Sequence, residues 1–163
     1  MANHCFNGIS FYGKNLTKIK KLIREAIEVN INHGWLPDFI DANKLRYAHY
    51  LFDVEIISES KESIGINCWT KWSPPIEELE LLCRQLKVNC TCSYEESGMG
   101  IYGQSEYNFE TDTTTDVYLD DDDTNRVQYD EENDCYLWDG KIVDSDIVAY
   151  QEMLDDKLTT NLN

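Results

Sequence analysis

The sequence predicts an α+β domain, on the evidence of two apolar patterns and the chain length. Apolar and polar residues alternate over residues 88–95, which is the period of a half-buried strand. Residues 15–33 and 76–86 instead repeat their apolar side chains every three or four positions, as amphipathic helices do. At 163 residues the chain has the size of one domain, and no linker divides it. We therefore expect strands and helices to share one core.

The chain up to residue 95 carries seven predicted elements. They are, in order, a strand over 4–12, a helix over 15–33, a short helix over 41–47, strands over 51–57 and 63–72, a helix over 76–86 and a strand over 88–95. Asn15 can cap the first helix, Gly34 suits its end, and Pro75 fits the first turn of the second long helix. Without the short helix the order is β-α-β-β-α-β. This is the ferredoxin-like split βαβ arrangement, with helices on one face of the sheet.

The rest of the chain is predicted to add an extra strand, an acidic hairpin and a helix. We expect a strand over 99–109, short strands over 117–119, 127–129 and 136–138, and a helix that starts at Asp144 or Ser145 and carries Ile147, Val148, Met153, Leu154 and Leu158. Asp139-Gly140 is a tight-turn signal, so residues 142–143 are expected to pair back on the preceding strand. We treat residues 1–163 as a single domain, with a ferredoxin-like core over 1–109 and an acidic elaboration over 110–163.

Residues 110–163 carry most of the negative charge. They hold three Lys or Arg against 17 Asp or Glu, so they contribute −14 of the net −17. Tyrosine, tryptophan and aliphatic residues are interleaved with the acidic ones, so we expect this segment to fold rather than to form a disordered tail. Its charge repels nucleic acid and anionic membranes. It attracts positively charged partners, at rates that fall as salt rises.

The most acidic stretch is predicted to be a partner-binding surface. Tyrosine and tryptophan are enriched in protein interfaces, and charges around them steer the encounter. The residues assigned to this surface are Asp116, Asp120, Asp121, Asp122, Asp123, Tyr129, Asp130, Glu131, Glu132, Asp134, Tyr136 and Trp138. A solvated face that only keeps the protein in solution is the alternative interpretation of the same charge.

Three motifs resemble ligand sites without completing their patterns. Gly98, Gly100 and Gly103 match GxGxxG, but no helix is predicted after them, so we interpret them as turn and strand glycines. Counted from Asp120, the acidic run follows a calcium-loop order, but Asn125 stands where that loop needs glycine. The cysteines lack the paired spacing of a zinc site and are expected in the core. No metal and no cofactor is therefore expected.

The sequence offers little for catalysis or export. None of the histidines, His4, His33 and His49, stands in a motif with a serine or cysteine nucleophile. We therefore assign no catalytic residues and do not expect an enzyme. No secretory signal or bilayer-spanning run is visible. We expect a protein of the reducing cytoplasm with free thiols.

Two short runs in the middle of the chain share a pattern with a known family. Residues 69–75 read WTKWSPP, and residues 94–100 read YEESGMG. With the opening MANHCFN, this pattern resembles the YubB-like family of phages and plasmids, which is described as having a ferredoxin-like domain. The matching residues are Thr70, Trp72, Ser73, Pro74, Pro75, Tyr94, Glu96, Gly98 and Gly103. The resemblance covers about residues 1–109 and implies the fold and a mobile-element origin, but it supplies no reaction.

The shared residues have a structural interpretation. Trp72 is expected to end a core strand, and the two prolines to fix the strand-to-helix turn. The glycines permit a tight hairpin. We therefore assign this motif to the scaffold.

These observations give one leading hypothesis and two alternatives. We expect a non-enzymatic phage or mobile-element protein of the host cytoplasm whose acidic segment mimics nucleic acid. It would inhibit a host defence protein that has a basic nucleic-acid-binding surface, such as a CRISPR effector nuclease. The second hypothesis makes the ferredoxin-like sheet a ligand-binding or metal-dependent enzymatic platform with an incidental acidic cover. The third places a binding surface on Trp69, Trp72 and residues 35–50.

Overall fold

The structure is a computed structural model that describes residues 3–29, 34–41, 45 and 48–161. Its elements are β1 (His4–Tyr12), α1 (Leu16–Val29), β2 (Phe52–Glu59), β3 (Ser63–Lys71), α2 (Ile76–Leu86), β4 (Asn89–Glu96), β5 (Ile101–Asn108), β6 (Thr113–Tyr118), α3 (Asp121–Thr124), β7 (Val127–Asp130), β8 (Cys135–Trp138), β9 (Lys141–Val143) and α4 (Asp146–Asn161). The predicted end of the first helix, at residues 30–33, and most of the predicted helix over 41–47 lie outside the described residues.

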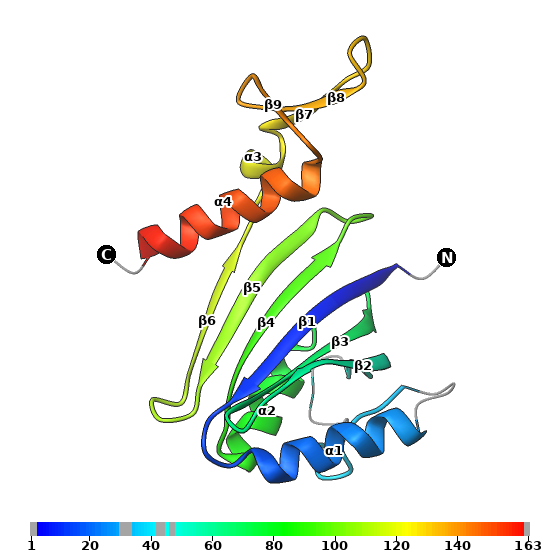
Figure 1. The fold of residues 1–163 in the computed structure, drawn as a ribbon, viewed down its shortest axis with the longest axis vertical. Helices are drawn as coiled ribbons and strands as arrows, with labels where there is room; N and C mark the ends of the chain where they lie inside the picture. Colours follow the sequence, from blue (N-terminus) through cyan, green and yellow to red (C-terminus); the bar gives the residue numbers. More distant parts are fainter. Residues whose placement is uncertain (1–2, 30–33, 42–44, 46–47, 162–163) are drawn as a thin grey trace.

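The main sheet confirms the ferredoxin-like prediction. Its six strands are ordered β2-β3-β1-β4-β5-β6, and every neighbouring pair is antiparallel (Figure 1). The first four strands therefore interleave as the split βαβ arrangement requires, with β1 between β3 and β4. The predicted strand after residue 98 is β5, which extends the sheet beyond β4.

One face of this sheet carries the main hydrophobic core, and α1 and α2 cover it. Every second residue of β1 from Cys5 to Phe11 is buried, as the alternation of a half-covered strand requires. Ile19 and Ile23 of α1 and Leu82 of α2 belong to the same buried cluster. Ile19 and Ile23 are four residues apart, which places both on the helix face that meets the sheet.

The helix α4 packs against the opposite face of the sheet. Tyr107 belongs to the main core, and Tyr102, five positions earlier on β5, faces the other way because strand residues alternate. The ring of Tyr102 lies 4.4 Å from that of Tyr150 on α4. Together with Leu119 and Met153, Tyr102 forms a second, smaller core. The acidic segment thus contributes both a strand of the main sheet and a helix that packs on the β5–β6 side of its second face.

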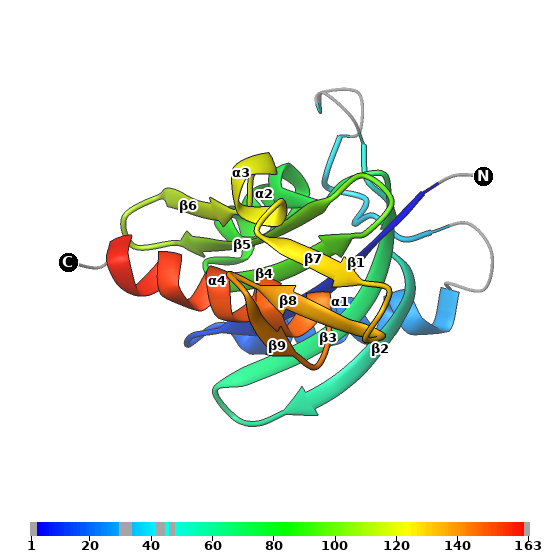
Figure 2. The ribbon, with the colours of Figure 1, turned by 90° about the horizontal axis from the view of Figure 1, so that it is seen from above.

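The remaining strands form a three-stranded sheet, β7-β8-β9, which projects beyond α4 from one end of the main sheet (Figures 1 and 2). Ile142 pairs in register with Leu137. The predicted turn at Asp139-Gly140 is confirmed, and both of its residues have positive φ angles, 49° and 79°. That combination is typical of the two-residue hairpin turns that match strand twist.

Two sequence expectations need correction, and one element was missed. Trp72 does not end a core strand, because it follows β3 with a φ of 72° and is 49% exposed. Ile147 and Val148 begin α4 but are exposed, whereas Met153 is buried. The turn α3 was not predicted at all. Among the described helices, none combines the length and apolar character needed to cross a membrane.

Candidate functional site

The carboxylates assigned to the partner-binding surface lie on β6, on α3 and in the turn between β7 and β8. The three cations of residues 110–163 are Arg126, Lys141 and Lys157. Arg126 hydrogen-bonds Asp139 through two nitrogens, and Lys157 donates to Asp123. The ion pairs of these cations therefore involve two carboxylates, Asp139 and Asp123. Most of the other acidic residues of this segment have no ion pair with a cation of the segment among the described residues.

The four aspartates of residues 120–123 form a self-capped helical turn. The Asp120 carboxylate accepts the backbone N–H of Asp123 at 3.0 Å, and the Asp123 carboxylate accepts that of Asp120 at 3.0 Å. This reciprocal pair is a capping box. Partial burial opposes ionisation of Asp123, but hydrogen bonds from Lys157 and the Asp120 backbone hold its pKa below the usual value. Asp121 and Asp122 point their charges into solvent from a rigid turn.

The turn between β7 and β8 is also fixed by its own side chains. Asp130 accepts hydrogen bonds from the backbone N–H groups of Glu132 and Asn133 and from the Asn133 side chain, at 2.8–3.2 Å. These bonds, led by the Asn133 side chain, lower the pKa of Asp130. The Tyr129 hydroxyl donates to Asp134 on the other side of the turn. Glu131 and Glu132 remain exposed at the tip.

The aromatic residues of the segment divide into scaffold and surface. Trp138 is half-buried, and the Arg126 guanidinium lies 5.8 Å from its ring centre. Tyr136 is half-buried beside Tyr129, with 5.1 Å between ring centres. Tyr129 itself is 51% exposed. Of the three aromatic residues assigned to partner binding, Tyr129 is therefore the one that offers most of its ring to a partner.

Several exposed apolar residues near this charge were not assigned to the partner-binding surface from the sequence. Tyr118 is 59% exposed and Ile142 is 75% exposed, and both stand beside acidic stretches in the chain. Ile147 and Val148 add exposed aliphatic surface at the start of α4. The signal was present, because Tyr118 follows the buried Val117 on a strand where alternate residues face opposite ways. Apolar side chains with a charged rim are typical of protein interfaces.

Asp116 links this surface to the family motif. It lies on β6 and accepts the Tyr94 hydroxyl at 2.8 Å. Burial, with help from this carboxylate, raises the pKa of Tyr94, so the hydroxyl stays protonated and donates. Asp116 is thus held in place, and its other oxygen is left for solvent or a partner.

Two further motif residues, Thr70 and Glu96, stabilise turns. The Thr70 hydroxyl donates to the Ser73 carbonyl at 2.7 Å and accepts from the buried Asn7 amide at 3.0 Å. The Glu96 carboxylate accepts the backbone N–H groups of Gly98, at 3.2 Å, and of Met99, at 2.5 Å. These bonds fix the connection from β3 to α2 and the turn from β4 to β5.

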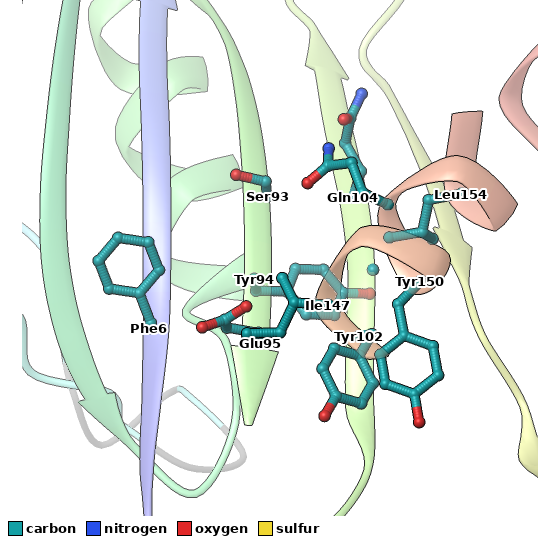
Figure 3. A pocket seen from close by; sticks show the side chains of 11 residues that line it. Phe6, Ser93, Tyr94, Glu95, Tyr102, Gln104, Ile147, Tyr150 and Leu154 are labelled. Atoms are coloured by element: carbon teal, nitrogen blue, oxygen red, sulfur yellow. The ribbon is translucent and has the colours of Figure 1, made fainter. Parts of the chain in front are cut away.

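Two cavities have different sizes and characters. The first, of about 130 Å³, lies where α4 meets the sheet, between Phe6, Glu95 and Gln104 on the strands and Ile147 and Tyr150 on α4 (Figure 3). It is smaller than the few hundred Å³ of a typical ligand site. We interpret it as the seam of α4 packing.

The second cavity has a volume of about 530 Å³ and lies at the end of β3. Its walls are Ala48, His49, Tyr50, Phe52, Lys71, Trp72, Ser73 and Met99. It includes part of the region that the third sequence hypothesis proposed, Trp72 and Tyr50, but not Trp69. Among the described residues, no group of three or more His, Cys, Asp or Glu side chains is arranged to hold a metal ion.

Comparison with known proteins identifies a family. A family model described as the ferredoxin-like domain in Api92-like protein matches residues 51–139. No curated protein and no solved structure matches the chain. The matched region begins at the residue before β2 and runs through α3, β7 and β8. It therefore extends past residue 109, where the sequence resemblance was expected to end, and takes in all twelve residues assigned to the acidic surface.

Proposed function

The chain belongs to the family described as the ferredoxin-like domain in Api92-like protein, and we propose that it acts by binding another protein through its acidic surface. The partner is a protein whose nucleic-acid-binding surface is basic. In its specific form, the chain is a phage or mobile-element protein that inhibits a host defence nuclease, such as a CRISPR effector. Binding of this kind needs no chemistry at the acidic surface.

The observation that carries this proposal is the fixed display of uncompensated carboxylates. Asp121 and Asp122 stand on a capped turn, and Glu131 and Glu132 on a turn held by Asp130. A disordered acidic tail would lose conformational entropy when it bound, whereas these groups are already ordered. Preorganised negative charge favours fast association with a basic surface.

The exposed apolar residues supply the contact area that charge alone does not give. Tyr118, Tyr129 and Ile142 are all more than half exposed. Tyrosine anchors contribute strongly to interfaces, while rim charges mainly set the rate and the specificity. The proposal therefore assigns steering to the carboxylates and anchoring to these side chains.

The test is competition for nucleic acid on purified proteins. RNA-guided nucleases and other basic nucleic-acid-binding proteins are mixed with labelled DNA, and displacement of the DNA by the chain is measured. The variant Asp121→Asn/Asp122→Asn/Glu131→Gln/Glu132→Gln removes four exposed charges and leaves the capping bonds in place. We expect it to weaken displacement by about 10-fold or more, mainly through slower association.

A matched control removes the same charge elsewhere. Glu28, Asp38, Glu55 and Glu62 are exposed in the first half of the chain, and their replacement by Gln or Asn also changes the net charge by +4. Equal weakening by both quadruple variants would show that total charge, not the acidic surface, drives binding. Failure of the wild-type chain to displace DNA from any member of the panel would contradict the proposal.

A further inference from the structure

His49 lies between a serine and a buried glutamate. Its Nε2 is 2.8 Å from Ser73 Oγ, and its Nδ1 is 3.1 Å from Glu78 Oε1. We propose that Ser73, His49 and Glu78 form a nucleophilic acyl-transfer site for small carboxylic esters. This site goes beyond the binding function above and uses none of the acidic surface. Ser73 and Glu78 come 24 and 29 positions after His49 in the sequence, so only the fold brings the three residues together.

Glu78 determines how the imidazole is oriented. Its side chain is 4% exposed, and its Oε1 accepts both the backbone N–H of His49, at 2.5 Å, and the Nδ1 side of the ring. A carboxylate at Nδ1 requires the proton on that nitrogen. Nε2 is then free to accept the Ser73 hydroxyl proton, which is the relation of base to nucleophile in a serine triad. Glu78 is therefore a positioning residue.

Glu78 also carries an unexplained atom. Its Oε2 is buried and has no hydrogen-bond partner among the described residues. Leaving a buried carboxylate oxygen without a donor is costly. The bonds of the other oxygen, Oε1, to the His49 backbone and to the His49 ring give a reason to keep a glutamate at this position.

The backbone before Ser73 is strained. Trp72 has a φ of 72°, and the Ser73 N–H donates to the Lys71 carbonyl at 2.9 Å, which closes a γ-turn with positive φ. Such turns are rare in non-glycine residues, and they concentrate where a side chain must be aimed. The Thr70 hydroxyl also stabilises this turn, because it donates a hydrogen bond to the Ser73 carbonyl.

The cavity beside these residues indicates the substrate class. His49 and Ser73 both line the hollow of about 530 Å³, which is within the range of small-molecule sites. Tyr50, Phe52 and Trp72 give it apolar walls, and Lys71 is the cation on its wall. An ester with an apolar or aromatic acyl group fits this lining.

The reaction follows from the hydrogen bonds. Ser73 Oγ attacks the acyl carbon, and its proton passes to His49 Nε2. The bond from the acyl carbon to the alcohol oxygen then breaks, and the alcohol leaves with the proton from His49. Water attacks the acyl-Ser73 ester in the same way, which releases the carboxylic acid and restores the serine.

Stabilisation of the oxyanion is the weaker part of this site. The backbone N–H of Ser73 is used by Lys71, and that of Trp72 donates to the Asn3 carbonyl at 3.0 Å. Loss of one oxyanion donor costs about 10²–10³-fold in rate in a serine protease. Lys71 is left as the nearby positive charge for both acylation and deacylation. Because p-nitrophenolate is a better leaving group than the serine alkoxide, acylation by a p-nitrophenyl ester should outpace deacylation, and an acyl-enzyme should accumulate.

The test is covalent labelling of the full chain. A fluorophosphonate probe, which reacts with activated serines, is added to the native protein, and the modified peptide is identified by mass spectrometry. We expect one label, on Ser73, and a stoichiometric burst of nitrophenol from p-nitrophenyl acetate. His49→Gln should slow labelling by about 100-fold or more, as loss of a general base does. Glu78→Gln should also slow it, and Ser93→Ala, a serine outside this cavity, should not.

Other outcomes would overturn the assignment. They are no label on the native wild-type chain, a label on a different serine, or an unchanged labelling rate in His49→Gln. Peptide mapping of the wild-type chain decides the first two even if a variant does not fold. Circular dichroism of each variant separates loss of the nucleophile from loss of the fold.

Discussion

Tyr94 and Gly103 face one another across β4 and β5, and the tyrosine ring fills the space that a side chain at residue 103 would need. A Cβ built on Gly103 would lie 2.3 Å from the Tyr94 hydroxyl and 2.4 Å from its ring carbon. The glycine is thus required by close approach, and the tyrosine by its bond to Asp116. Two residues of the family motif are explained by one contact.

Gly103→Ala is expected to destabilise the protein by about 1–3 kcal/mol, because the new methyl group must displace a packed ring. Thermal unfolding measures the change. Gly8→Ala is the matched control, since the closest contact of its Cβ would be the movable Ser93 hydroxyl at 2.9 Å, and it should cost less. When Gly103→Ala is combined with Tyr94→Leu, the cost of the added methyl group should shrink. If Gly103→Ala lowered the stability equally in the wild-type and the Tyr94→Leu backgrounds, this explanation would be contradicted.

The cysteines are expected to differ sharply in reactivity. Cys5, Cys68, Cys83, Cys90 and Cys92 are buried, and Cys135 is half-buried on β8. Burial raises the pKa of Cys5 and of Cys68 to about 12, so almost no thiolate is present at pH 8. Iodoacetamide at pH 8 should therefore modify Cys135 first in the native protein. Mass spectrometry checks this, and rapid addition of two or more groups would contradict it.

At the scale of elements, the sequence predicts the strands and long helices well, because each has a regular apolar period. The predicted alternation of buried and exposed residues in β4 and the predicted apolar stripe of α2 are both found in the structure, with almost the same residues. Only the last two residues of β6, Val117 and Tyr118, were predicted as strand, because residues 113–116 are all exposed and show no alternation. The turn α3 was missed since it has no apolar residue, and only the Asp120 and Asp123 spacing marks its cap.

The small sheet β7-β8-β9 is expected to depend on Arg126. This residue pairs with Asp139, and its guanidinium also lies over Trp138. Arg126→Gln should therefore speed amide exchange across residues 127–138 relative to the main sheet. Lys141→Gln, which removes a charge from the same sheet without that stacking, is the control and should have a smaller effect.

The ion pair between Arg126 and Asp139 predicts that the stability of the small sheet depends on pH. Hydrogen bonds from Arg126 hold the pKa of Asp139 below its usual value. A lowered native pKa means that the pair stabilises the fold above the unfolded pKa of about 3.9 and is lost as pH falls through the native value. Protection of residues 127–138 should thus drop below about pH 4 in the wild type, and this drop should be smaller in Arg126→Gln. Identical profiles would contradict the prediction.

For the whole molecule, the fold was more predictable than the sites. The acidic stretch could be recognised because its carboxylates lie close together in the sequence, although their division into paired and unpaired groups could not be predicted. His49, Ser73 and Glu78 could not be associated from sequence, because their proximity depends on how the segment before β2 lies against the start of α2. These three residues belong to separate parts of the chain, so no short sequence motif contains them.

The net charge of −17 is expected to give folding and binding opposite responses to salt. With 31 acidic against 14 basic residues, repulsion exceeds the surface ion pairs, each of which contributes about 0–1 kcal/mol or less. Screening should therefore raise the melting temperature between about 10 mM and 300 mM salt, as the Debye length falls. Attraction to a basic partner should weaken over the same range.

The quadruple variant at Asp121, Asp122, Glu131 and Glu132 should flatten both responses, because the same charges strain the fold and steer the partner. Differential scanning calorimetry and association kinetics at matched salt concentrations measure the two effects. The control variant at Glu28, Asp38, Glu55 and Glu62 should flatten the melting response while leaving most of the association response, because its charges lie away from the acidic surface. If the control flattened association equally, the partner would be sensing total charge, and the local display on α3 and the β7–β8 turn would not matter.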